Sequence, residues 1–378
     1  MIERLKKFLH TEAAGGVVLV MAAAAAILVA NSSLKPNYIQ LLNHHLGPFT
    51  VLEWVNDALM AIFFFVVGME IKAELSTGAL ASFDRAILPI VGAIGGMVVP
   101  AVVFLIFAGS TGGAHGWGIP MATDIAFAVG VLALLGKRIP TNLKVFLLAL
   151  AIADDLGAVL VIALVYTKSI DWVSLGIAVS LFVLIYGLVK KGAHSTLVYI
   201  PLGIASWWFI HASGVHATIA GCVLGFLVPH PRVLTQKLHG VSSFVIMPLF
   251  ALANAGLSFQ GVTAAQVFSD PLVSGISYGL LLGKPIGIFG ACWIAVKVKL
   301  ARLAESVTWM MLLGAACLGG IGFTMSLFVA SLALPSAELL DLAKLGIVKG
   351  SLLSAIAGAL LLLGAGGYAG SKSKARAQ

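Results

Sequence analysis

Charged residues are scarce in this sequence of 378 residues. Asp, Glu, Lys and Arg make up 10% of the chain, whereas about a quarter is usual in a soluble domain. A soluble protein of this length needs a charged surface to stay dissolved, so the shortage excludes a water-soluble globule. Hydrophobic residues make up 60% of the chain and the mean hydropathy is +1.06, which places the protein in a lipid bilayer.

The sequence also lacks the patterns of a disulfide or metal site and of a nucleic-acid-binding surface. The chain has only three cysteines, Cys222, Cys292 and Cys317, and each lies within an apolar run. Their odd number argues against a disulfide framework or a metal site, so we interpret them as small packing residues and expect no cofactor. The net charge of +8 does not indicate a nucleic-acid partner, because the basic residues form no patch interleaved with aromatic residues.

Long apolar runs fill the rest of the sequence. A membrane helix needs about 20 apolar residues, so the chain has room for about a dozen spans and for no separate extramembrane domain. We therefore treat residues 1–378 as a single all-α membrane domain. The first run is longer than the apolar part of a usual signal peptide, so we expect it to be a retained helix. The predicted spans are residues 12–31, 52–77, 86–109, 117–136, 142–167, 172–189, 196–210, 214–228, 241–257, 272–296, 309–333 and 343–367.

The basic residues predict the orientation of these twelve spans. An even number of spans places both termini on one side of the membrane. Of the 23 Lys and Arg residues, only Lys35, Lys168 and Lys344 lie on the opposite side, and only Lys284 and Lys349 lie within spans. Because basic residues concentrate in cytoplasmic connections, we expect both termini in the cytoplasm.

A few ionisable residues lie deep in the apolar spans. A charge at mid-span costs at least about 2.5 to 3.5 kcal/mol on the translocon scale, so such residues are candidates for function. Glu70, Glu74 and Lys349 lie nearer the span ends. The deep group consists of Asp57, Asp124, Asp154, Asp155 and Lys284.

The adjacent pair Asp154 and Asp155 is the most informative feature. Successive helical residues point about 100° apart, so one carboxylate can hold a protein cation while the other faces a cavity. Lys284, next to a proline at mid-span, is the natural partner for an aspartate of this span. We interpret Asp155 as the main cation ligand and Asp154 as the partner of Lys284. The alternative is structural: two acids satisfied by a lysine and hydroxyl groups, and a lysine whose ammonium reaches the interface.

Two spans look broken. Residues 117–136 contain Pro120 followed by Thr123 and Asp124, and residues 309–333 contain several glycines, among them Gly320. Interrupted helices at corresponding places in two halves indicate a transporter site, although glycines also serve close helix packing. An unwound segment exposes helix ends: Asp124 could neutralise the positive ends and Lys284 the negative ones. Residues 86–167 and 272–367 each place the broken span in the middle, which predicts an inverted repeat.

These groups allow an exchange mechanism. Two neighbouring carboxylates do not both ionise as readily as isolated ones, so the site holds a proton at low pH and offers hard oxygen ligands to a small cation at higher pH. If the site faces each side of the membrane in turn, this competition becomes exchange. His216, at the start of a span, is a candidate pH sensor or a hydrogen-bonded structural histidine. Glu70 and Glu74 could form a cation-attracting mouth or an ordinary solvated helix end.

The chain resembles the NhaA family of bacterial sodium/proton antiporters over nearly its whole length. The motifs that carry the resemblance are NDALMAIFFFVVGMEIK, ATDIAFAVGVLALLGKR, LALAIADDLGA, SGVHATIAG, MPLFALANAG, LLGKPIGI and GIGFTMSLFVASLA. The resemblance implies twelve helices with two crossed, interrupted ones, in the inner membrane. It also implies electrogenic exchange of two protons for one Na⁺ or Li⁺, activated at alkaline pH.

The resemblance also assigns roles to residues. Asp154 and Asp155 match the paired aspartates of the family, Thr123 and Asp124 match the residues at the broken helix, and Lys284 matches the lysine that pairs with the first aspartate. We therefore expect Asp154 and Asp155 to hold the Na⁺ ion transiently. Further positions that the family links to assembly or to the pH response are Asp57, Glu70, Glu74 and His216.

The sequence departs from the family pattern at three places. Ala73 stands where a basic residue is common, and Thr235 stands where an acid is common, so the pH set-point is not predicted. The connection 31–51 is short, so we expect the β-hairpin that pairs two copies to be reduced or missing, which weakens the prediction of a homodimer.

Two other functions remain as alternatives. An intramembrane aspartyl protease needs its two aspartates on separate, facing helices, whereas here they are contiguous. A cation channel or a cation-coupled symporter could use the same scaffold, but a channel favours a ring of carbonyls or acids and a symporter a larger polar pocket.

Overall fold

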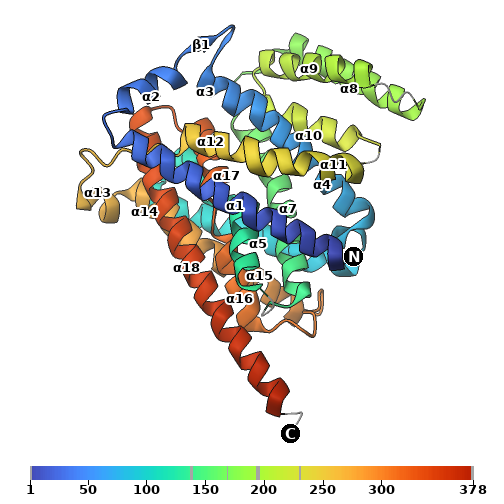
Figure 1. Ribbon diagram of the computed structural model, residues 1–378, viewed down its shortest axis with the longest axis vertical. Coiled ribbons are helices and arrows are strands. Elements are labelled where there is room, and N and C mark those ends of the chain that lie inside the picture. The colour runs from blue at the N-terminus through green and yellow to red at the C-terminus, as the bar shows by residue number, and fades with distance from the viewer. Residues whose placement is uncertain (1, 137–138, 168, 193–195, 230, 376–378) are drawn as a thin grey trace.

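The computed structural model describes residues 2–136, 139–167, 169–192, 196–229 and 231–375. These residues fold almost entirely into helices, as the apolar runs predict (Figure 1). The helices are α1 (Ile2–Ala30), α2 (Lys35–Leu42), α3 (Val51–Glu53), α4 (Met60–Thr77), α5 (Phe83–Ala108), α6 (Ile125–Leu134), α7 (Thr141–Val165), α8 (Trp172–Lys190), α9 (Thr196–Ala212), α10 (Thr218–Leu227), α11 (Pro231–Val241), α12 (Met247–Asn254), α13 (Ala264–Ser269), α14 (Pro271–Tyr278), α15 (Lys284–Lys297), α16 (Trp309–Gly319), α17 (Phe323–Ala333) and α18 (Ala337–Ala375).

Shorter helical segments of a different winding join several of these helices. The 3₁₀-helices that lie wholly within the described residues are η2 (Ala79–Ala81) and η3 (Ala114–Met121). Three are π-helical, η1 (Trp54–Leu59), η5 (Ser242–Ile246) and η6 (Gly279–Gly283). The last of these ends at Gly283, directly before α15, and Pro285 in the first turn of α15 has no N–H to donate to the carbonyl four residues earlier. Such π-turns often accompany functional sites.

Within the described residues, seven helical segments are long and apolar enough to cross a membrane, and the bent pair α16 and α17 makes an eighth. Helical segments also lie in each of the other predicted ranges, among them α9 and α10, which are shorter. The chain is therefore an all-α membrane protein. Twelve crossings and the inverted repeat stay predictions.

Both predicted interruptions are present. The 3₁₀-helix η3 ends at Met121, and α6 begins at Ile125, so residues 122–124 are extended. In the second pair, α16 ends at Gly319 and α17 begins at Phe323, with a bend of 43° between them. Pro120 in the first pair and the glycines of the second explain why a regular helix does not continue through either break.

Close packing of small residues brings the helices together. On α10, a side chain at Gly225 would have its Cβ 2.8 Å from the Met69 backbone nitrogen of α4. A Cβ at Gly68 would likewise lie 3.1 Å from Cα of Cys222. Backbones can approach this closely only where side chains are absent. The three cysteines are buried among these helices.

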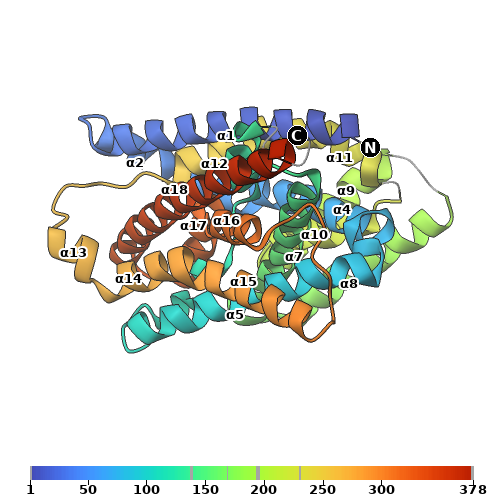
Figure 2. The same ribbon diagram turned by 90° about the horizontal axis from the view of Figure 1, so that it is seen from below.

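The two chain ends and the segments α2, β1 and α13 lie at different ends of the bundle. The amino end of α1 and the carboxyl end of α18 lie away from α2, β1 and α13 (Figure 1). Figure 2 shows α1 and α5 on opposite faces of the bundle. The connection 31–51 contains a hairpin of only two residues per strand, β1 (His45–Leu46) and β2 (Phe49–Thr50), which agrees with the expected reduction.

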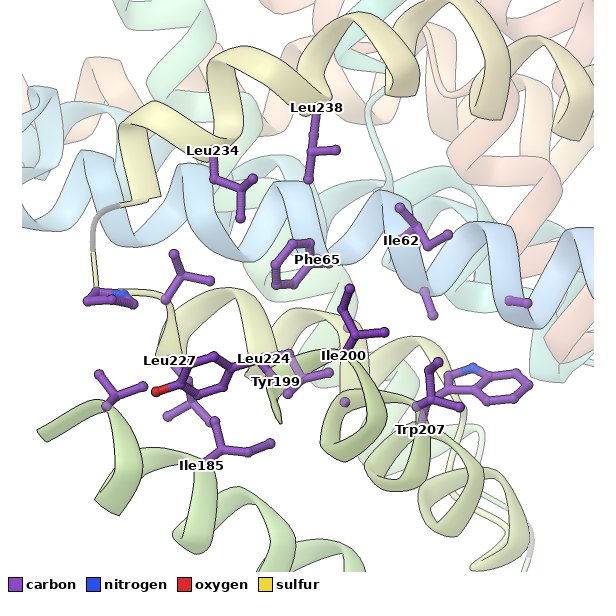
Figure 3. Close-up of a pocket in the computed structure, with 18 of the residues that line it drawn as sticks. Ile62, Phe65, Ile185, Tyr199, Ile200, Trp207, Leu224, Leu227, Leu234 and Leu238 are labelled. Carbon is purple, nitrogen blue, oxygen red and sulfur yellow. The ribbon is translucent and has the colours of Figure 1, made fainter. Parts of the chain in front are cut away.

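A large apolar cavity lies between α4 and the helices α8 to α11. Its volume is about 880 Å³, and side chains such as Phe65, Tyr199, Trp207 and Leu238 point into it (Figure 3). Among the described residues that line it, only Tyr199 is ionisable. The ion chemistry predicted from the sequence therefore belongs elsewhere in the bundle.

Candidate functional site

Three predicted site residues from distant parts of the sequence form one buried cluster. Lys284 at the start of α15 donates to the Asp154 carboxylate of α7 and to the Thr123 hydroxyl oxygen, 2.8 Å away. All three side chains are at most 1% exposed. The Thr123 hydroxyl oxygen also lies 2.6 Å from Asp154 Oδ2 and 2.8 Å from the carbonyl oxygen of Gly319. Its single proton can serve one of these acceptors at a time.

The two interrupted helices meet at Asp124. The backbone N–H of Asp124 donates to the carbonyl of Ile321 over 2.6 Å, which ties the breaks of the two helices together. Its side chain caps α6, since Oδ1 accepts from the N–H of Phe127 at 3.1 Å. Its other oxygen, Oδ2, accepts from the N–H of Thr324 at 3.0 Å and from the Thr324 hydroxyl. One carboxylate therefore compensates the positive ends of both α6 and α17.

The opposite, negative helix ends meet hydroxyl groups. The carbonyl of Gly319, at the end of α16, faces Thr123, and the carbonyl of Ile119 in η3 accepts from the Ser326 hydroxyl at 2.7 Å. The Lys284 ammonium contacts Thr123 directly. A cation thus lies near the negative end of α16 and an anion at the two positive ends, which is the favourable arrangement for helix dipoles.

Asp155 has different surroundings from its neighbour. It is 2% exposed, and its Oδ2 has no hydrogen-bond partner within the part of the chain that the structure describes. The same holds for Oδ1 of Asp154. Buried carboxylate oxygens are normally paired, so these two oxygens are available to a ligand or a proton. Asp155 and Asp124 both line a small cavity of about 40 Å³.

The same cavity is lined by Glu70 of α4 and His239 of α11. Their side chains meet with Glu70 Oε1 and His239 Nδ1 3.3 Å apart. The sequence placed His239 in a connection and gave it no role. The spacing in the sequence could have indicated a role for His239, because residues four apart lie on one face of a helix. His239 and Ser243 have this spacing, and both line the cavity.

The remaining predicted residues lie apart from this cluster. The Glu74 carboxylate accepts from the N–H of Ala79 at 2.6 Å and so serves the end of its own helix. Asp57, in η1, faces His211 with Oδ2 and Nδ1 4.0 Å apart. His216 lies just before α10, where its carbonyl accepts from Ile219.

Gly320 lies at the break between α16 and α17. A Cβ there would lie 2.7 Å from the Ser354 hydroxyl oxygen and 3.1 Å from the carbonyl oxygen of Cys317. Only a glycine fits this space without moving its neighbours. The sequence analysis gave no role to Thr324, Ser326 and Ser351, although a hydroxyl within an apolar span is the signal that would have found them.

The chain is similar to a large group of known proteins. Residues 6–362 match the family model described as Na⁺/H⁺ antiporter 1. The chain is 46% identical over 381 residues to the "Na(+)/H(+) antiporter NhaA" of Sphingopyxis alaskensis, covering 95% of this chain and 90% of that protein. It is 46% identical to the "Na(+)/H(+) antiporter NhaA 1" of Klebsiella pneumoniae subsp. pneumoniae, covering 96% of each. It is 43% identical to the "Na(+)/H(+) antiporter NhaA 2" of Erythrobacter litoralis, covering 99% of this chain and 97% of that protein.

Proposed function

The chain belongs to the NhaA family of Na⁺/H⁺ antiporters, and from this we propose that it exchanges protons for Na⁺ or Li⁺ at the paired aspartates Asp154 and Asp155. The observation that carries the proposal is the buried Asp155 carboxylate, which lines a cavity and has an oxygen without a partner in the described part of the chain. We infer that this oxygen takes either a proton or the cation.

Competition between a proton and a cation for the Asp155 carboxylate couples proton transport to cation transport. At low pH the buried carboxyl holds a proton, because a proton removes the cost of a charge in apolar surroundings. At higher pH the carboxylate provides a hard oxygen ligand suited to a small cation. The neighbouring residue Asp154 also has an oxygen without a partner among the described residues, and we infer that the cation competes with the Lys284 ammonium for that carboxylate.

The same competition explains how binding of one cation releases a second proton. When a cation binds the Asp154 carboxylate, Lys284 loses its ion-pair partner. A buried lysine without a partner releases its proton more readily. Asp154 itself is the other candidate carrier. Two protons that move inward for each Na⁺ that moves outward transfer one net positive charge, so the proposed exchange is electrogenic.

We propose that movement of the interrupted helices, where they meet, exposes the site to each side of the membrane in turn. Both breaks meet at Asp124 through hydrogen bonds rather than through continuous helices. Segments of this kind can shift without breaking a regular hydrogen-bonded ladder, and interrupted helices are typical of transporters that expose a site to each side in turn.

We propose that the pH response depends on the contact between Glu70 and His239 in this cavity. The ionisable residues that line the cavity are Glu70, Asp124, Asp155 and His239. Histidine changes its charge in the range from pH 5 to pH 8, so the Glu70–His239 contact is strong at low pH and weakens as the imidazole loses its proton. Glu70 is then free to attract a cation.

The proposed location is the bacterial inner membrane, with twelve crossings, an inverted repeat of residues 86–167 and 272–367, and both termini in the cytoplasm. The excess of basic residues on the terminus side supports this orientation. The position of both chain ends on one side of the bundle is compatible with it.

Everted membrane vesicles test the proposal. A Na⁺ pulse is expected to dissipate a respiration-driven proton gradient in vesicles with the wild-type chain, and Asp155→Asn is expected to abolish the response. A channel would pass Na⁺ without a proton gradient, and a symporter would need an organic substrate. Undiminished Na⁺-driven proton flux in Asp155→Asn would contradict the assignment of Asp155.

A further inference from the structure

The positive end of α17 has a second cap, which comes from α18. The hydroxyl oxygen of Ser351 accepts from the backbone N–H of Gly322 at 3.2 Å and from that of Phe323 at 3.1 Å. The next N–H along the chain, that of Thr324, donates to Asp124. Three successive N–H groups at this helix end are therefore shared between a neutral hydroxyl on one helix and a carboxylate on another.

This helix end is close to the candidate site. Met325 in the first turn of α17, and Ile125 and Ala126 in the first turn of α6, line the same small cavity as Asp155. The amino end of a helix carries a partial charge of roughly +0.5, located on its unsatisfied N–H groups. In buried surroundings such a charge is poorly screened. Any N–H group that loses its cap therefore adds positive potential at the cavity.

We propose that Ser351 is a positioning residue for cation binding. It satisfies two of the N–H groups of α17, so that Asp124 has to compensate only the third and the first turn of α6. The positive end of α17 then does not repel the cation from Asp155. This inference rests on the proposed function, because it concerns the affinity of the same site for its cation.

The chain offers a matched control on the same helix. Ser354 lies one turn beyond Ser351 on α18, is fully buried, and has a hydroxyl without a hydrogen-bond partner among the described residues. Ser354→Ala removes the same atom as Ser351→Ala from a neighbouring buried position. It does not remove a cap.

The test compares these variants in everted vesicles, with the Na⁺ concentration for half-maximal proton release as the readout. Ser351→Ala is expected to raise the apparent KM for Na⁺ roughly fivefold or more, the size expected for an uncompensated helix end in buried surroundings, with the maximal rate per folded protein unchanged. Ser354→Ala is expected to keep the wild-type KM. Ser351→Thr retains the hydroxyl and is therefore also expected to have the wild-type KM.

A merely structural role for Ser351 would lower the amount of active protein and leave KM unchanged, because KM does not depend on the amount. An equal KM in Ser351→Ala and Ser354→Ala would therefore overturn the inference. If Ser351→Ala does not accumulate, Ser351→Cys can replace it, because cysteine has a similar side-chain volume and a weaker hydrogen-bond acceptor. A wild-type KM in Ser351→Cys would likewise overturn the inference. Absence of Na⁺-driven proton release from the wild-type chain would instead refute the proposed antiport, and this inference with it.

Discussion

Asp124 and Thr324 join the two interrupted helices, although 200 positions separate them in the sequence. The Asp124 carboxylate accepts from both the backbone N–H and the hydroxyl of Thr324, while its other oxygen caps its own helix at Phe127. A negative charge shared between two positive helix ends stabilises the crossing more than a neutral cap would.

Asp124→Asn is expected to weaken the crossing. An asparagine presents one acceptor oxygen and one NH₂ group, so one of the two helix ends would face a donor instead of an acceptor. We expect a loss of about 1 to 3 kcal/mol of stability and at least a tenfold loss of transport. Thermal unfolding in detergent and proton release from vesicles measure the two effects. A melting temperature and a rate equal to those of the wild type would contradict the role of the shared charge.

Asp154 and Lys284 are expected to be energetically coupled. Removal of either partner alone leaves a buried charge without compensation, which destabilises a protein by about 3 to 5 kcal/mol. We expect the double variant Asp154→Asn/Lys284→Met to be less destabilised than the two single variants together, with a coupling of about 0.5 to 3 kcal/mol. Thermal or denaturant unfolding in detergent checks this.

The control for that cycle pairs Lys284→Met with Ser354→Ala. The Ser354 hydroxyl has no hydrogen-bond partner among the described residues, so these two changes are expected to be additive. Strict additivity in the Asp154 and Lys284 cycle as well would show that the ion pair contributes no specific stability.

The Glu70–His239 contact is expected to set part of the pH profile. His239→Ala removes the imidazole that holds Glu70 at low pH, so the mouth carboxylate stays free to attract cations there. We expect the onset of transport to move to lower pH. Rates measured in vesicles from pH 6 to pH 9 test the direction, and an unchanged or alkaline-shifted onset would contradict it.

Glu74→Gln serves as the control for Glu70→Gln. The two acids lie one turn apart on α4, but Glu74 accepts from Ala79 at the helix end and does not line the cavity. A glutamine oxygen can still accept that bond. We therefore expect Glu70→Gln to alter the pH profile and Glu74→Gln to leave it unchanged. Equal shifts in both variants would indicate a general effect of surface charge.

The predicted orientation can be tested with single cysteines. In a background in which Cys222, Cys292 and Cys317 are replaced by alanine, Asn37→Cys and Lys191→Cys each place one thiol at an exposed position. A membrane-impermeant reagent is expected to label position 37 in intact cells from outside. It should reach position 191 only in everted vesicles. The reverse pattern would invert the topology.

The apolar runs and their interruptions could be predicted from the sequence because both are local properties. Apolar length indicates a membrane helix, and proline, glycine and an acid within such a run indicate a break. The helices are accordingly interrupted at residues 122–124 and 320–322, within the two spans that the sequence predicts to be broken. The candidates Asp154, Asp155 and Lys284 stood out for the same reason, since a charge in an apolar span needs an explanation. The roles of Glu74 and His239 could not be predicted, because they depend on which surface faces a neighbouring helix.

The sequence by itself determined that this chain lies in a membrane, which family it resembles, and which few residues can carry charge there. These conclusions need only hydropathy, spacing and residue type. Only the tertiary structure decided that Asp154 meets Lys284 while Asp155 lines a cavity, and that Asp124 and Ser351 cap one helix end from two sides. The reason is physical: contacts between residues far apart in the chain depend on how the helices pack, and hydropathy carries no information about which helix faces which.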